Sequence, residues 1–203
     1  MRANFGLLVV IAAAVFCLAQ TAPATTVAPT PLPEMVQASP SIIHGTVTAT
    51  SARWTEDGSM IVTDVTVQVH DVLRGDARRN VVFTQPGGSV GAVRVDVPGA
   101  SAFQAGEEAV FFLAPGGSGE DLYLYGLDRG RFVVTQDPAD GEKLIRGLDE
   151  AQLGVLLTAP VGVVSTSSRV TGGALKLSDF KAGVRRLRDA PPPKDNIRDG
   201  GER

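Results

Sequence analysis

The residue whose surroundings most closely match a catalytic motif is Ser89, at the centre of the glycine-rich segment GGSVG (residues 87–91). This segment fits the G-x-S-x-G pattern, in which a strained turn leads from a strand directly into a helix and exposes a nucleophilic serine. The residues after Gly91 alternate as a strand does, and both histidines of the chain, His44 and His70, precede the serine. The motif therefore lacks its structural context, and we interpret residues 87–91 as a wide turn that glycine makes possible.

The two histidines have other interpretations. With Asp71, either His44 or His70 could be the base for Ser89 in a His, Asp, Ser chain order, and both could bind a metal together with Asp64 or Asp71. The sequence period places both imidazoles on outward strand faces, where nothing aligns them with the serine. A zinc site needs three or four ligands at close spacing, which this sequence does not offer. We expect solvated histidines, with no catalytic residue, no metal ligand and no cofactor.

Two other features could take part in binding. Five basic residues could contact an anionic partner: Lys176, Lys181, Arg185, Arg186 and Arg188. Favourable charges near the C-terminus of a solvated helix explain them better. Trp54 is the only tryptophan, and it is either an exposed binding anchor or an apolar cover over one end of the fold.

The charge of the chain argues against two classes of partner. The formal net charge is −3, and acidic and basic residues are interspersed along the chain. Because no region carries a strong field of one sign, the sequence does not point to nucleic acid or to a membrane surface.

The N-terminus predicts export. Arg2 precedes an apolar run over residues 5–18, and the sequence Ala22-Pro23-Ala24 follows. This is the pattern of a secretory signal peptide over residues 1–24, cleaved after Ala24 or, as the alternative, after Ala19. The apolar run is shorter than the roughly 20 residues that a membrane-spanning helix needs. We therefore expect a secreted or periplasmic protein with no membrane span after signal removal.

Cys17 is the only cysteine, and it lies inside the predicted signal peptide. The mature chain would then have no disulfide, no thiolate ligand and no cysteine nucleophile. Acylation of Cys17 as a bacterial lipoprotein is disfavoured, because Phe16 stands where that processing prefers a small residue.

The composition divides the rest of the chain. Residues 25–40, rich in Thr, Ala and Pro, predict a flexible linker. Residues 41–148 alternate apolar and polar side chains between turns, which is typical of a closed or nearly closed antiparallel barrel or of a sandwich. The predicted strands lie at residues 41–50, 61–69, 80–85, 93–97, 109–113, 122–127 and 131–135, and the apolar run AVFFL at 109–113 predicts burial on both faces.

Residues 149–189 predict a loop and a C-terminal helix that packs on the barrel. Asp149 is a candidate cap for a short helix over residues 149–157, and Ser178 is a candidate cap for the C-terminal helix. The apolar stripe of that helix comprises Phe180, Val184 and Leu187. Residues 190–203 have little to bury and predict a disordered tail.

Five segments resemble, in order, the strand sequence of the netrin-module and tissue-inhibitor-of-metalloproteinase family: SIIHGTVTAT, VTDVTVQVHDVLRGD, NVVFTQPGGSVG, FQAGEEAVFFLAPGG and LYLYGLDRGRF. The match covers residues 41–135 and includes a family-like corner at residues 72–75 (VLRG) and the stretch at 106–113. The resemblance implies an OB-like five-stranded barrel, in which residues 87–91 join the third and fourth strands. Family inhibitors chelate the protease zinc through an N-terminal cysteine, which the mature chain lacks, so that mechanism transfers to no residue here.

We therefore expect a mainly β protein, an OB-like antiparallel β-barrel of about five to seven strands with a C-terminal α-helix. Its expected function is that of an exported, non-enzymatic binding domain whose partner is another exported protein. One alternative is a regulator or inhibitor of an extracellular metalloprotease, acting through the loops at residues 87–91 or 115–119. The other alternative is a serine hydrolase that uses Ser89.

Overall fold

The computed structural model describes residues 30–76, 78–116, 121–157 and 174–191. The predicted signal peptide with Cys17 and both cleavage sites, residues 25–29 of the predicted linker, and residues 192–203 of the predicted tail lie outside the described residues.

The fold is mainly β with a C-terminal helix, as the sequence predicts. The sheet is mixed, whereas the sequence predicted antiparallel strands throughout. Eight strands follow one another in the order β1-β2-β3-β7-β6-β8-β9-β10, and β1 also pairs with β6. Among the described strands, β3 and β7 pair in parallel, through Thr84 and Tyr123, and the other neighbours are antiparallel. The strands are β1 (Ser41–Trp54), β2 (Ile61–Arg74), β3 (Asn80–Pro86), β6 (Glu108–Pro115), β7 (Leu122–Leu124), β8 (Arg131–Gln136), β9 (Lys143–Ile145) and β10 (Leu175–Lys176).

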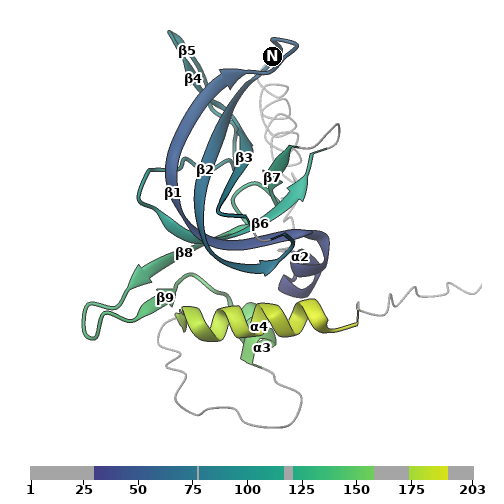
Figure 1. Ribbon diagram of the computed structural model, residues 1–203, viewed down its shortest axis with the longest axis vertical. Helices are drawn as coiled ribbons and strands as arrows, with labels where there is room; N and C mark the ends of the chain where they lie inside the picture. Colours follow the sequence, from purple (N-terminus) through teal and green to yellow (C-terminus); the bar gives the residue numbers. More distant parts are fainter. Residues whose placement is uncertain (1–29, 77, 117–120, 158–173, 192–203) are drawn as a thin grey trace, which may run out of the picture.

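A separate hairpin lies between β3 and β6 in the chain. It consists of β4 (Gly88–Val90) and β5 (Val93–Val95), which pair only with each other among the described strands. The predicted fourth strand at residues 93–97 is therefore the second arm of a short hairpin and no member of the main sheet. The hairpin projects from the end of the sheet that is opposite to helix α4 (Figure 1).

Two hydrophobic clusters pack on opposite faces of the sheet. The inner cluster comprises Ile43, Val47, Val65, Val67, Val81, Phe83, Ala109, Phe111, Leu113 and Leu124. The outer cluster joins Ile42, Val110, Phe112 and Phe132 to side chains of three helices. Strand β6 contributes Phe111 to one cluster and Phe112 to the other, and both side chains are fully buried. The prediction that residues 109–113 are buried on both faces is confirmed.

The linker prediction for residues 25–40 is wrong where the chain forms helix α2 (Leu32–Ala38). Leu32, Met35 and Val36 are buried in the outer cluster, and Pro33 lies in the first turn, where proline leaves no helical donor unpaired. The spacing of the three apolar residues is that of one helix face. The described fold therefore begins before Ser41.

Two more helices follow the sheet. Helix α3 (Glu150–Leu157) has the predicted cap, because the Gln152 backbone N–H donates to Asp149 Oδ1 at 2.7 Å and the Asp149 N–H donates to Gln152 Oε1 at 3.1 Å. Helix α4 (Leu177–Asp189) begins one residue before the predicted cap Ser178, and no side chain caps it. The predicted stripe is confirmed: Phe180 and Val184 are buried in the outer cluster, and Leu187 packs against it.

Figure 1 shows α4 crossing below the curved strands β1 and β2, with α2 and α3 beside it. Among the described residues, no helix is both long enough and apolar enough to cross a membrane.

Candidate functional site

Ser89 is the central residue of β4 and not the tip of a turn, which corrects the interpretation of residues 87–91. It pairs with Arg94 of β5, and the turn between the two strands contains Gly91, which adopts a φ of 59°. A strand therefore follows the serine, so the strand-to-helix turn of a hydrolase nucleophile is absent from this described segment. The Ser89 side chain is exposed at the edge of a pocket.

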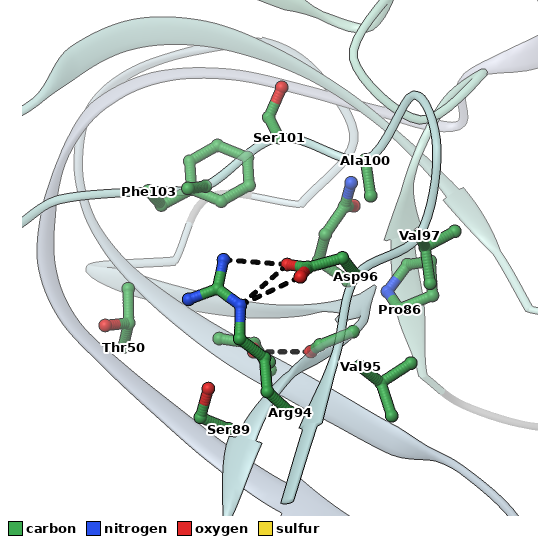
Figure 2. Close-up of a pocket in the computed structure, with 15 residues that line it drawn as sticks. Thr50, Pro86, Ser89, Arg94, Val95, Asp96, Val97, Ala100, Ser101 and Phe103 are labelled. Carbon is green, nitrogen blue, oxygen red and sulfur yellow. Dashed lines mark hydrogen bonds and ion pairs between the residues drawn. The ribbon is translucent and has the colours of Figure 1, made fainter.

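This pocket, which we call the hairpin pocket, has a volume of about 420 Å³ and lies between the end of the sheet and the β4–β5 hairpin. Figure 2 shows Ser89, Arg94 and Phe103 around it. Its lining residues are Thr50, Thr63, Gln85, Pro86, Gly87, Gly88, Ser89, Arg94, Val95, Asp96, Val97, Ala100, Ser101, Ala102 and Phe103.

The buried polar group of the hairpin pocket is the side-chain amide of Gln85. Gln85 is 2% exposed, and neither Nε2 nor Oε1 has a hydrogen-bond partner. Strand alternation explains its position, because Val81, Phe83 and Gln85 fall on the same face of β3, and the first two belong to the inner cluster. The amide therefore occupies a place where the sheet otherwise holds apolar side chains.

The walls of the hairpin pocket are held in place by their neighbours. Thr63 Oγ1 donates to the Gly87 carbonyl at 2.7 Å, which ties the start of the hairpin to β2. The Phe103 and Phe83 rings pack edge-to-face, with their centres 5.3 Å apart. The Arg131 guanidinium carbon lies 5.0 Å from the centre of the Phe103 ring. The aromatic wall is thus packed against the inner cluster and fixed from behind.

The mouth of the hairpin pocket carries one cation and one anion. Arg94 Nη2 lies 2.7 Å from Asp96 Oδ1, and the two side chains are 72% and 74% exposed. Hydrogen bonds from Arg94 lower the pKa of Asp96, so the carboxylate is charged at neutral pH. Such an exposed pair contributes little to stability, but it leaves the mouth with no net charge.

The histidine prediction is wrong for His44, which is 5% exposed. Its Nε2 lies 2.7 Å from Glu108 Oε1, and Lys143 Nζ donates to the same carboxylate at 2.8 Å. Strand alternation places His44 on the outer face of β1 correctly, but Glu108 of β6 and the His70 ring lie against it there. His70 is exposed as predicted, and it shares a hydrogen bond of 2.8 Å with Thr46.

The structure brings the two histidines together without a metal site. Their ring centres are 5.4 Å apart, and no group of three or more potential metal ligands occurs among the described residues. Burial lowers the pKa of His44, and the hydrogen bond to Glu108 offsets this only in part. Burial alone would raise the pKa of Glu108, but hydrogen bonds from Lys143 and His44 outweigh it, and the pKa lies below its ordinary value.

The two candidate aspartates are held by cations. Asp71 Oδ2 lies 2.5 Å from Lys181 Nζ, and Asp71 Oδ1 lies 2.8 Å from Arg185 Nη2. Burial alone would raise the pKa of Asp71, but the hydrogen bonds from these two cations outweigh it and lower the pKa. Asp64 accepts two hydrogen bonds from Arg53, at 2.6 Å and 3.1 Å, and lines a second pocket of about 720 Å³. Both carboxylates are therefore structural partners of cations in the described fold.

The remaining basic residues of the C-terminal part also face protein groups. Lys176 Nζ donates to Glu142 at 2.7 Å, Arg186 donates to the Leu156 carbonyl, and Arg188 donates to the Leu73 carbonyl at 2.7 Å. Together with the Asp71 pairs, these contacts bind β10 and α4 to the rest of the fold. Each of the five cations therefore has a partner group within the described fold. Trp54 ends β1 and is 42% exposed.

No protein-family model, curated protein or solved structure matches the chain.

Sequence reasoning missed Gln85, Phe103 and Glu108. The signal for Gln85 was present, because the segment NVVFTQ places a glutamine in step with Val81 and Phe83 on the apolar face. Glu108 stands beside the predicted strand at residues 109–113, but its pairing with His44 depends on the contact between β1 and β6, which are distant in sequence.

Proposed function

We propose that the chain is an exported, non-enzymatic binding domain built on an OB-like barrel. The strand pairings support a barrel, because β1–β2, β2–β3, β3–β7, β7–β6 and β6–β1 return to the strand from which they start. One contact of this circuit, between β3 and β7, is parallel, and the other contacts are antiparallel. The predicted signal peptide supports a secreted or periplasmic location.

The observation that carries the binding function is the unpaired Gln85 amide in the hairpin pocket. An unpaired buried polar group is unfavourable for folding, and a ligand that pairs with it would offset this cost. The position of such a group in a pocket lined by other polar groups therefore supports a role in recognition. The pocket offers no matched acid and base, because both candidate histidines lie elsewhere and are not among its lining residues. We therefore favour binding over hydrolysis by Ser89.

The proposed partner is another exported protein. The β4–β5 hairpin projects at the end of the sheet away from the helices (Figure 1), and Val93 on it is 46% exposed. The same feature favours a second candidate, regulation of an extracellular protease, in which the hairpin would enter the protease cleft. Neither binding to an exported protein nor protease regulation by the hairpin requires the zinc-chelating cysteine of the inhibitor family.

A photo-reactive phenylalanine analogue placed at Val93 tests the binding function in the exporting cell. The matched control is Val133 on β8, which is 37% exposed and does not line the hairpin pocket. We expect a covalent adduct with one exported protein from position 93 and none from position 133. Equal adduct yields at the two positions, or no adduct at either, would contradict the proposal.

Two further measurements separate the alternatives. A fluorophosphonate probe should not label the protein, whereas labelling of the wild type that Ser89→Ala abolishes would establish a serine hydrolase. If the adduct partner is a protease, deletion of residues 88–95 should abolish its inhibition. Inhibition that survives this deletion would place the contact elsewhere.

A further inference from the structure

We propose that the hairpin pocket binds the side-chain carboxamide of an asparagine or glutamine presented by an extended polypeptide. This inference rests on the proposed binding function and specifies the group that is recognised. The chemistry of Gln85, the walls of the pocket and the free edge of β5 support it.

Gln85 offers one donor group and one acceptor side by side. Its Nε2 carries two hydrogens and its Oε1 accepts, and both atoms are buried and unpaired. Either orientation of the amide leaves the same two functions next to each other. A ligand therefore satisfies Gln85 fully when it presents an acceptor and a donor at matching spacing.

This requirement excludes the charged side chains. A carboxylate accepts at both oxygens and leaves Oε1 of Gln85 unpaired, whereas an ammonium group only donates and leaves Nε2 unpaired. A trans peptide bond directs its N–H and C=O to opposite sides, so it meets one of the two atoms. A primary carboxamide presents both groups on one edge and can form two parallel hydrogen bonds with Gln85.

The rest of the hairpin pocket suits a neutral group on a short apolar stem. Its volume of about 420 Å³ lies in the range of small-ligand sites. Phe103, Val95 and Val97 supply apolar walls for methylene groups. The Arg94–Asp96 pair leaves the mouth without net charge, so it gives no preference to an anion or a cation.

The hairpin favours a polypeptide as the source of the carboxamide. Among the described strands, β5 pairs with β4 alone, so one edge of β5 is available for main-chain hydrogen bonds. An extended partner segment can add to such an edge. Val95 belongs to β5 and also lines the pocket, so a segment paired with β5 can place a side chain at the pocket mouth.

The test uses the full exported chain and three blocked peptides, N-acetyl-Val-Xaa-Val N-methylamide with Gln, Glu or Leu at Xaa. The Leu peptide controls for main-chain amides, and the Glu peptide has the shape of glutamine without its donor. We expect the Gln peptide to shift the side-chain ¹H–¹⁵N signals of Gln85 and to bind at least about tenfold more tightly than the other two. Gln85→Met should bring the three affinities within about twofold.

Several results would overturn the inference: equal binding of the Gln and Glu peptides, no binding of any peptide, or unchanged selectivity in Gln85→Met. Uracil, which has an adjacent donor and acceptor on a planar ring, tests the need for a polypeptide. If uracil binds as tightly as the Gln peptide, the site belongs to a small molecule.

The position 93 adduct separates this inference from the proposed function. If the adduct still forms in Gln85→Met but the wild type binds the Gln, Glu and Leu peptides equally, the binding function is supported and the carboxamide site is refuted. If the wild type prefers the Gln peptide but no adduct forms at position 93, the carboxamide site is supported and the exported protein partner is refuted.

Discussion

Replacing Gln85 by methionine should make the unliganded protein more stable. Methionine is unbranched and of similar length, so it can fill the same space while removing both unpaired amide atoms. Leaving a buried donor or acceptor unpaired costs about 1–3 kcal/mol, so we expect a gain of that size in the free energy of unfolding. For a chain of this size, each kcal/mol corresponds to a rise of about 2–4 °C in the midpoint of thermal unfolding.

Urea unfolding followed by circular dichroism and by Trp54 fluorescence measures this change. The matched control is Gln37→Met, because Gln37 Nε2 donates to the Leu187 carbonyl at 3.0 Å. That variant should lose about 1 kcal/mol, the opposite sign from Gln85→Met. A loss of 1 kcal/mol or more in Gln85→Met would show that the Gln85 amide is well satisfied in the unliganded protein, and the argument for a recognition site would fail.

Three other changes test the interior of the fold. The free energy of unfolding should fall as pH drops below about 6.5, because the pKa of His44 is lower in the folded protein than in the unfolded chain, which therefore takes up the proton first. His44→Leu should flatten this part of the pH profile. Asp71→Asn should cost about 1–2 kcal/mol in urea unfolding, less at high salt, because it breaks the pairs with α4. Gly45→Ala should cost about 1–3 kcal/mol or more, because its methyl group would meet the β2 backbone and the Val67 side chain.

Each of these predictions has a result that would contradict it. A pH profile that is the same with and without His44 would mean that its protonation does not distinguish folded from unfolded chains. A salt-independent effect of Asp71→Asn would point to lost packing instead of lost charge. Gly154→Ala is the control for Gly45→Ala, since the space around its Cβ position is open and alanine favours a helix; equal losses in the two variants would refute the steric argument.

Alternation along the chain was sufficient to predict the central strands, but it could not show what covers them. Val65 and Val67 lie on the predicted inner face of β2. The outer face of β1 was expected to be solvated, but His44 there is buried and pairs with Glu108 of β6, which is distant in sequence. A period of two residues identifies the two faces of a strand and says nothing of long-range partners.

Short elements escaped prediction for a related reason. Residues 32–38 carry only three large apolar side chains in a proline-rich context, so composition favoured a linker. Packing against α3, α4 and β6 stabilises the helix. Strand β9 has only three residues and β10 only two, and they pair with each other across a gap of 29 positions between Ile145 and Leu175. For the hairpin pocket, the position of Gln85 could be read from the sequence, but its unpaired state could not.

Strand β6 contributes side chains to both hydrophobic clusters, so the two clusters depend on the same strand. Phe111 belongs to the inner cluster and Phe112 to the outer one, so neighbouring residues of one strand pack into both clusters. A shortened chain that ends after β8 would keep the residues of the hairpin pocket but would leave Phe132 facing water where Phe180 of α4 now packs. Such a fragment is expected to aggregate, so the helices that seem remote from any binding surface belong to the smallest unit that can carry one.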